Sequence, residues 1–254
     1  MNEEYKYDVL RMFYAEDYWV TDKIVIHQPT IQKIMDYGES QFWSIVSVLC
    51  ANPTSMRLEL WKNGIDWNNI SDFELFIYLT SSLPKESTEI LFGELDLTKF
   101  KEIKNNDEKS VLVYMPDPVI QIDEEVYNRL VGYLRVMFDI HPKTEKAKGK
   151  LTKEAIIWED EMNRNVALNK AKENKWNQST LFPLISSALN HPGFKYKKNE
   201  LREIGIFEFM DSVRRLQIIE SSTALMTGMY MGMVDLKDAK INKELNWMRD
   251  IYQE

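Results

Sequence analysis

The sequence predicts an α+β fold that is predominantly helical, with short N-terminal strands, a helical bundle, a small antiparallel β-meander in the middle and an all-helical C-terminal part. Apolar residues recur at helical spacing along most of the chain. Short runs of β-branched and aromatic residues interrupt this spacing at residues 18–26 and 88–122. With 254 residues, of which 44% are hydrophobic, the chain is long enough to bury a substantial core.

Residues 1–84 are expected to form a compact unit of short helices behind a small β element. Residues 18–26 contain the strand signal, and Thr30 can cap the helix that follows. Ser71 and Glu74 fit a capping box, in which the Ser71 hydroxyl accepts from a backbone N–H and Glu74 reaches back. A second helix carries an apolar stripe at i, i+3, i+4 and i+7, formed by Phe42, Ile45, Val46 and Leu49.

Residues 85–142 are expected to form a small β-meander followed by a helix. Asp123 can cap this helix, and the acidic residues after it favour its first turn. The expected strands are the short apolar runs Ile90–Phe92, Phe100–Ile103, Val111–Met115 and Val119–Ile122. Whether this segment is a separate domain or an insertion stays open at the sequence level.

A Lys-rich linker is expected over residues 143–153, because a run of like charges around Gly149 is typical of a solvated connection. It leads into a helical C-terminal region, residues 154–254. A polar helix is expected over 152–176, and its thin apolar stripe consists of Ile156, Met162 and Val166. Further helices are expected from Leu181 to His191 and over 206–231.

Charge and cysteine content restrict the function classes. The formal net charge of -8 argues against nucleic-acid binding, which usually requires a basic surface. The single cysteine, Cys50, cannot form an internal disulfide and suits a reducing compartment. The first residues lack a secretory signal, and no run reaches the roughly 18 apolar residues of a membrane span. We therefore expect a protein of the host cytoplasm with no membrane partner.

No motif for a cofactor or a metal ion stands out, so neither is expected. The three histidines, His27, His141 and His191, are far apart and lack cysteine or acidic partners at ligand spacing. The 9 glycines form no phosphate-binding loop. One arrangement, Asp96 with Glu102 and Lys104, resembles the cluster of some metal-dependent nucleases, where two carboxylates hold Mg²⁺. A nuclease is therefore kept as an alternative function.

Methionines are concentrated at the end of the last long helix. Their flexible, polarizable side chains suit an adaptable surface for apolar partners, although ordinary core packing is the commoner explanation for such a cluster. The candidate partner-binding residues are Met226, Met229, Tyr230, Met231 and Met233.

Three parts of the sequence resemble proteins of phage tail modules. Residues 24–39 (IVIHQPTIQKIMDYGE) are similar to the start of phage tail-assembly chaperones, in which a short strand leads into Pro-Thr and a helix with an early Gly-Glu. The segments NGIDWN (63–68) and SDFELF (71–76) resemble tail-module proteins from phages of low-GC Gram-positive bacteria, as do FMDSVRRLQ (209–217) and NWMR (246–249). The resemblance covers residues 18–80 and 180–250.

The resemblance implies a non-enzymatic chaperone without catalytic residues. Such chaperones coat the long helical tape-measure protein, recruit tail-tube subunits and leave before the virion is complete. Self-association stays open. A structural virion component, such as a connector or baseplate protein, is the main alternative.

Overall fold

The computed structural model describes residues 7–105, 107–173, 179–232 and 243–252. The chain is predominantly helical with two small antiparallel sheets, so the predicted fold class is confirmed. The α-helices are α1 (Val9–Phe13), α2 (Ile31–Tyr37), α3 (Glu39–Leu49), α4 (Arg57–Lys62), α5 (Asp72–Thr80), α6 (Lys85–Phe92), α7 (Glu124–Met137), α8 (Lys150–Glu173), α9 (Leu181–Asn190) and α10 (Ile206–Tyr230). The strands are β1 (Tyr18–Thr21), β2 (Ile24–Ile26), β3 (Phe100–Lys104), β4 (Ser110–Tyr114) and β5 (Gln121–Ile122).

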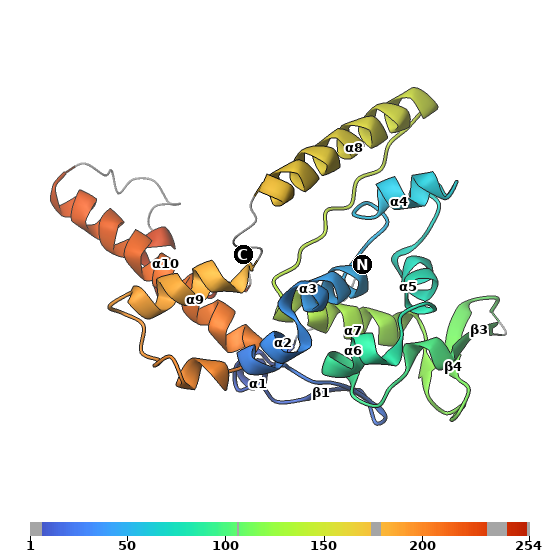
Figure 1. Cartoon of the computed structure of the whole chain (residues 1–254), viewed down its shortest axis with the longest axis horizontal. Helices are drawn as coiled ribbons and strands as arrows, with labels where there is room; N and C mark the ends of the chain where they lie inside the picture. The colour runs from blue at the N-terminus through green and yellow to red at the C-terminus, as the bar shows by residue number, and fades with distance from the viewer. Residues whose placement is uncertain (1–6, 106, 174–178, 233–242, 253–254) are drawn as a thin grey trace.

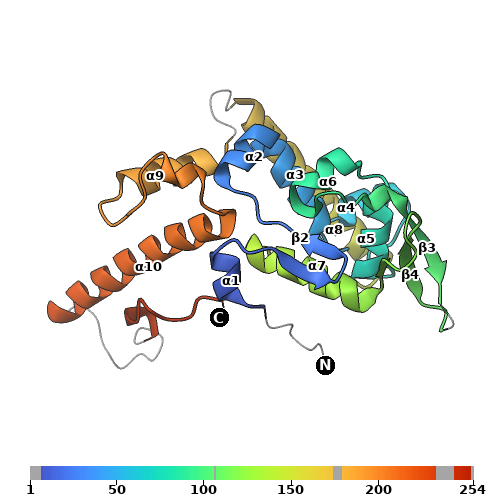
Figure 2. The same cartoon turned by 90° about the horizontal axis from the view of Figure 1, so that it is seen from below.

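The elements spread to both sides of a central group of helices. Figure 1 shows α2, α3, α6 and α7 in the centre, α9 and α10 on one side, and the sheet of β3 and β4 on the other. Helix α8 lies along one edge of the molecule, and a long extended segment connects it to α7. Seen from below, α10 projects away from the central helices (Figure 2).

The two sheets lie in the two regions where the sequence predicts strands. Strands β1 and β2 form a hairpin, and β3, β4 and β5 form an antiparallel meander in that order. The predicted strand Ile90–Phe92 is wrong, because these residues belong to α6. Thr88, Leu91 and Phe92 are buried at i, i+3 and i+4, which is helical spacing, and Gly93 at φ +57° ends the helix.

The predicted helix caps are confirmed. Thr30 accepts from the backbone of Lys33, and Asp123 accepts from Val126. Ser71 and Glu74 form both halves of the capping box that opens α5. These contacts span at most four residues, so the local sequence suffices to predict them.

One large hydrophobic core contains buried residues of the described helices and strands other than α4 and α8. It extends along the sequence from Met12 to Phe209 and includes buried residues of α7 such as Leu130 and Leu134. Each of the ranges 1–84, 85–142 and 154–254 contributes buried residues to this core. A second, smaller cluster lies under α4 and α8 and contains Ala51, Leu60, Trp67, Leu75, Ala147 and Ile157.

Segments from the two ends of the chain pair beside the core. The Ile31 N–H donates to the Ile204 carbonyl, the Ile206 N–H donates to Pro29, and Thr30 bridges to Gly205. A Cβ on Gly205 would lie 2.2 Å from Oε1 of Gln28 and 2.9 Å from Cβ of Ala15, so a larger residue would displace both neighbours at this junction. The buried Gln28 amide donates to the Met12 carbonyl at 2.8 Å and accepts from the Phe207 N–H at 3.3 Å.

Glu39 in the first turn of α3 caps a different helix, α9. Its carboxylate accepts from the Thr180 N–H at 2.7 Å, the Leu181 N–H at 2.8 Å and the Ser179 hydroxyl at 2.5 Å. Burial by itself would raise the pKa of Glu39, but these hydrogen bonds outweigh it and hold the pKa below its ordinary value of 4.5. The carboxylate thus ties α9 to the central helices.

We expect Glu39→Gln to lower the free energy of unfolding by about 1 kcal/mol at neutral pH, because a charged acceptor is replaced by a neutral one. The folded-state pKa is lowered, so the stabilisation is present above the ordinary value of 4.5 and is lost as the pH falls through the lowered pKa. Urea unfolding at several pH values measures the difference. Glu86→Gln, in the first turn of α6, is the control and should show a smaller, less pH-dependent change.

Candidate protein-interaction surface

Helix α8 is held to the rest of the protein along one face. It packs against α4, where Ile157 lies in the smaller apolar cluster with Leu60 and Trp67. Three ion pairs join the two helices, with partners Arg57–Asp160, Lys62–Glu161 and Arg164–Glu59. At 24 residues α8 is about 36 Å long, which is more than six helical turns.

The opposite face of α8 carries an exposed apolar stripe. Leu151 is 82% exposed, Trp158 66%, Met162 47% and Val166 48%. Spacings of seven, four and four residues place these side chains within about 80° around the helix axis, on the side away from Asp160. We call these four residues the α8 stripe. Large exposed apolar side chains gathered on one face are typical of protein–protein contact sites.

The thin stripe predicted for this helix combined two faces. Ile156 is partly buried against the cluster under α4, whereas Met162 and Val166 are exposed on the other side. Leu151 and Trp158, which complete the exposed face, were missed by the sequence analysis. Their separation of seven residues was the signal that could have identified them.

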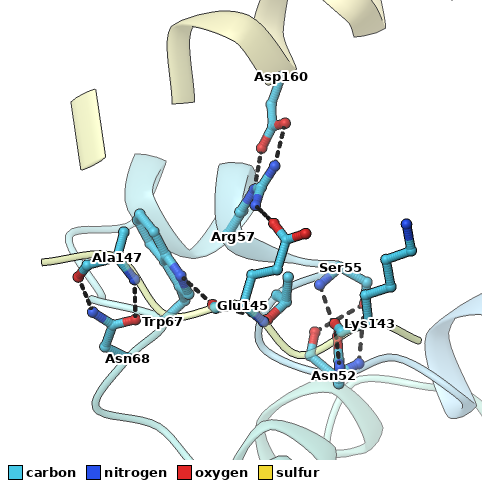
Figure 3. A network of polar contacts seen from close by, with 10 residues as sticks. Asn52, Ser55, Arg57, Trp67, Asn68, Lys143, Glu145, Ala147 and Asp160 are labelled. Atoms are coloured by element: carbon cyan, nitrogen blue, oxygen red, sulfur yellow. Dashed lines mark hydrogen bonds and ion pairs between the residues drawn. The ribbon is translucent and has the colours of Figure 1, made fainter. Parts of the chain in front are cut away.

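The segment that leads into α8 is bound to the loops around α4 (Figure 3). We call residues 139–149 the strap. The Asn52 side chain donates to the Lys143 carbonyl at 3.0 Å, the Glu145 N–H donates to Thr54 at 2.9 Å, and the Asn68 side chain donates to the Ala147 carbonyl at 2.6 Å.

The strap differs from the solvated linker predicted over residues 143–153. The side chains of Lys143, Lys146, Lys148 and Lys150 are exposed, as expected for a charge run. The backbone between them is nevertheless held by hydrogen bonds, and α8 already begins at Lys150. Lys153 forms an ion pair with Asp66 and lies 5.6 Å from the ring centre of Trp67.

Arg57 joins the strap to α8 (Figure 3). Its guanidinium donates to both carboxylate oxygens of Asp160, at 2.5 and 2.7 Å, and to Glu145 at 3.0 Å. Its side chain is 18% exposed, and the hydrogen bonds that it donates to the carboxylates of Asp160 and Glu145 raise the pKa of Arg57 above its ordinary value. An open pocket of about 430 Å³ lies beside it, lined in part by Lys143 and Asn163.

The predicted methionine patch lies at the far end of α10. Tyr230 is 82% exposed and Met231 is 65% exposed, whereas Met226 and Met229 are half-buried. Met233 lies outside the described residues. Among the described residues of the patch, Tyr230 and Met231 are therefore the most accessible to a partner.

The two carboxylates of the predicted nuclease cluster, Asp96 and Glu102, form hydrogen bonds with different neighbours. Asp96 is nearly buried and accepts from the Thr98 N–H and hydroxyl, which caps a short 3₁₀ turn. Glu102 is exposed on β3 and accepts from the Ser110 hydroxyl at 2.5 Å. Among the described residues, no group of three or more His, Cys, Asp or Glu side chains is placed to hold a metal ion.

The histidines and the cysteine also occupy separate environments. His27 contacts Asp17, His141 contacts Asp139, and His191 contacts Glu220. Cys50 is buried at the end of α3, and this burial raises the pKa of its thiol to about 12. At neutral pH the thiol is protonated and a poor nucleophile.

In the ranges that the structure describes, no helix has both the length and the apolar composition to cross a lipid bilayer. Neither protein-family models, nor curated proteins, nor solved structures gave a match to this chain, so the α8 stripe and the strap are interpreted from their own geometry.

Proposed function

We propose that this protein is a non-enzymatic phage tail-assembly chaperone that binds the tape-measure protein and tail-tube subunits during tail morphogenesis. The resemblance of residues 24–39, 63–68, 71–76, 209–217 and 246–249 to phage tail-module proteins suggests this class. The observation that carries the proposal is the α8 stripe, an exposed apolar face on a long helix that is fixed to the protein by its other side.

A helix with such a face suits a helical partner. An amphipathic helix buries apolar side chains that recur on one face against a neighbour, and the spacings of seven, four and four residues keep the α8 stripe on one face over four turns. The exposed carboxylates of Glu154 and Glu159 border the stripe and favour a partner with basic residues beside its own apolar face. The tape-measure protein is long and helical, so covering its apolar faces would keep it from aggregating before assembly.

We expect the double substitution Trp158→Glu with Met162→Glu to reduce co-purification with the tape-measure protein at least tenfold, because two charges would enter the centre of the contact. Both side chains are exposed, so the circular dichroism spectrum and thermal midpoint should change little. The measurement is the amount of tape-measure protein retained by the tagged chain after co-expression.

Met115→Glu is the matched control, since Met115 is 49% exposed but lies beyond β4, far along the chain from α8. Tyr230→Glu with Met231→Glu tests the end of α10 in the same assay. Full retention by the α8 variant would contradict the proposal for the α8 stripe. Mass spectrometry of purified virions separates a chaperone, which should be absent, from a structural component, which should be present in stoichiometric amount.

A further inference from the structure

The contacts between the strap and its neighbours follow the pattern of a protein that binds an extended peptide. Every second residue of this part of the strap is hydrogen-bonded to the loops, namely Lys143, Glu145 and Ala147. In an extended chain, alternate residues direct their backbone groups to the same side. The strap therefore offers one edge of its backbone to the protein, as an added strand would.

Side chains of the loops around α4 form hydrogen bonds with the backbone groups along this edge of the strap. Asn52 and Thr54 come from the loop before α4, and Trp67 and Asn68 come from the loop after it. Thr54 accepts from the Glu145 N–H, and the Trp67 indole donates to the Glu145 carbonyl at 3.3 Å. Asn68 bonds both backbone groups of Ala147, donating at 2.6 Å and accepting at 3.4 Å. We call these four residues the strap groove.

Two side chains of the strap indicate which residue types the strap groove accepts. Ala147 is 7% exposed and belongs to the apolar cluster with Leu60 and Trp67, so a larger or charged side chain would not fit there. Glu145 forms an ion pair with Arg57 at 3.0 Å. The side chains of Lys143, Lys146 and Lys148 are exposed. The groove thus selects an acidic residue followed, two positions later, by a small apolar one.

We infer that the strap groove is a binding site for an extended peptide segment with an acidic residue two positions before an alanine-sized one, and that the strap is its intramolecular occupant. A segment of this kind in a partner protein would replace the strap and form the same backbone hydrogen bonds. Because the strap is tethered, its effective concentration is high, and a partner segment competes against it. This inference goes beyond the proposed function and does not depend on it.

The test uses a fluorescent peptide with the sequence of residues 141–149 and the full chain with Ala147→Asp. The aspartate cannot enter the apolar cluster, so the strap leaves the groove while all four groove residues are retained. We expect fluorescence anisotropy to show that the peptide binds this variant at least about tenfold more tightly than the wild-type chain, where the strap competes. Glu145→Lys, which places a cation beside Arg57, is a second way to release the strap.

Two controls locate the binding. The peptide that itself carries the Ala147→Asp change should not bind, and adding Asn68→Ala to the released chain should weaken binding of the unmodified peptide. The inference is overturned if the peptide binds neither released variant. It is also overturned if the peptide binds wild-type and released chains equally, because the peptide would then occupy another surface.

Discussion

Gln28→Ala is expected to lower the free energy of unfolding by about 3 kcal/mol. The buried amide of Gln28 bonds the Met12 carbonyl at the end of α1 and the Phe207 N–H in the first turn of α10. Removing it leaves the Phe207 N–H buried without its acceptor and opens space beside Gly205. Urea unfolding followed by circular dichroism measures the loss.

Gln28→Met separates the loss of the hydrogen bonds from the loss of packing volume. Methionine fills most of the volume of glutamine but cannot form either hydrogen bond. We expect it to cost about 1 to 2 kcal/mol, less than alanine. Gln32→Met is the control, since the amide of Gln32 donates to Asp36 at the surface of α2. Equal stability of the Gln28 and Gln32 variants would show that the junction of α1 and α10 does not depend on this amide.

Arg135→Leu is expected to lower the free energy of unfolding by about 2 to 3 kcal/mol. Arg135 on α7 donates to the carbonyls of Cys50 and Ala51, both at 3.1 Å, at the end of α3. It also contacts the Asp72 carboxylate at 3.3 Å, in the first turn of α5. A cation at the end of α3 is favoured by the helix dipole, and its loss leaves buried carbonyl groups without donors.

Arg135→Lys should recover part of the loss, because lysine keeps the charge but cannot donate in two directions from one plane. Arg129→Leu serves as the control on the same helix, since its side chain makes no hydrogen bond or ion pair within the described ranges. A loss at Arg129 as large as that at Arg135 would mean that general replacement of arginine on α7, and not the contact with α3, causes the effect.

The sequence predicted the features that depend on neighbouring residues. The caps at Thr30, Ser71 and Asp123 were predicted because donor and acceptor lie within four residues of each other. Residues 90–92 were predicted as a strand because a short apolar run fits both a buried strand and the buried end of a helix. Only the positions of Thr88 and Leu91 on one buried face separate the two.

The interaction surface could not be predicted from the sequence, because it depends on contacts between residues that are far apart along the chain. Asn68 and Ala147 are 79 residues apart, and Arg57 and Asp160 are 103 residues apart. A run of exposed lysines predicts solvated side chains correctly, yet it carries no information about where the backbone hydrogen bonds go. The two faces of α8 could not be told apart until the position of α4 was known.

The junction of residues 29–31 with 204–206 also constrains how the protein is made. A ribosome adds about 5 to 20 residues per second, so roughly ten seconds or more pass between synthesis of Gln28 and of Phe207, its hydrogen-bond partner. During that interval the apolar side chains of α1 lack α10, the helix against which α1 packs. The junction of residues 29–31 with 204–206 therefore forms late in synthesis. A truncated chain that stops before Gly205 should be captured by cellular chaperones and proteases.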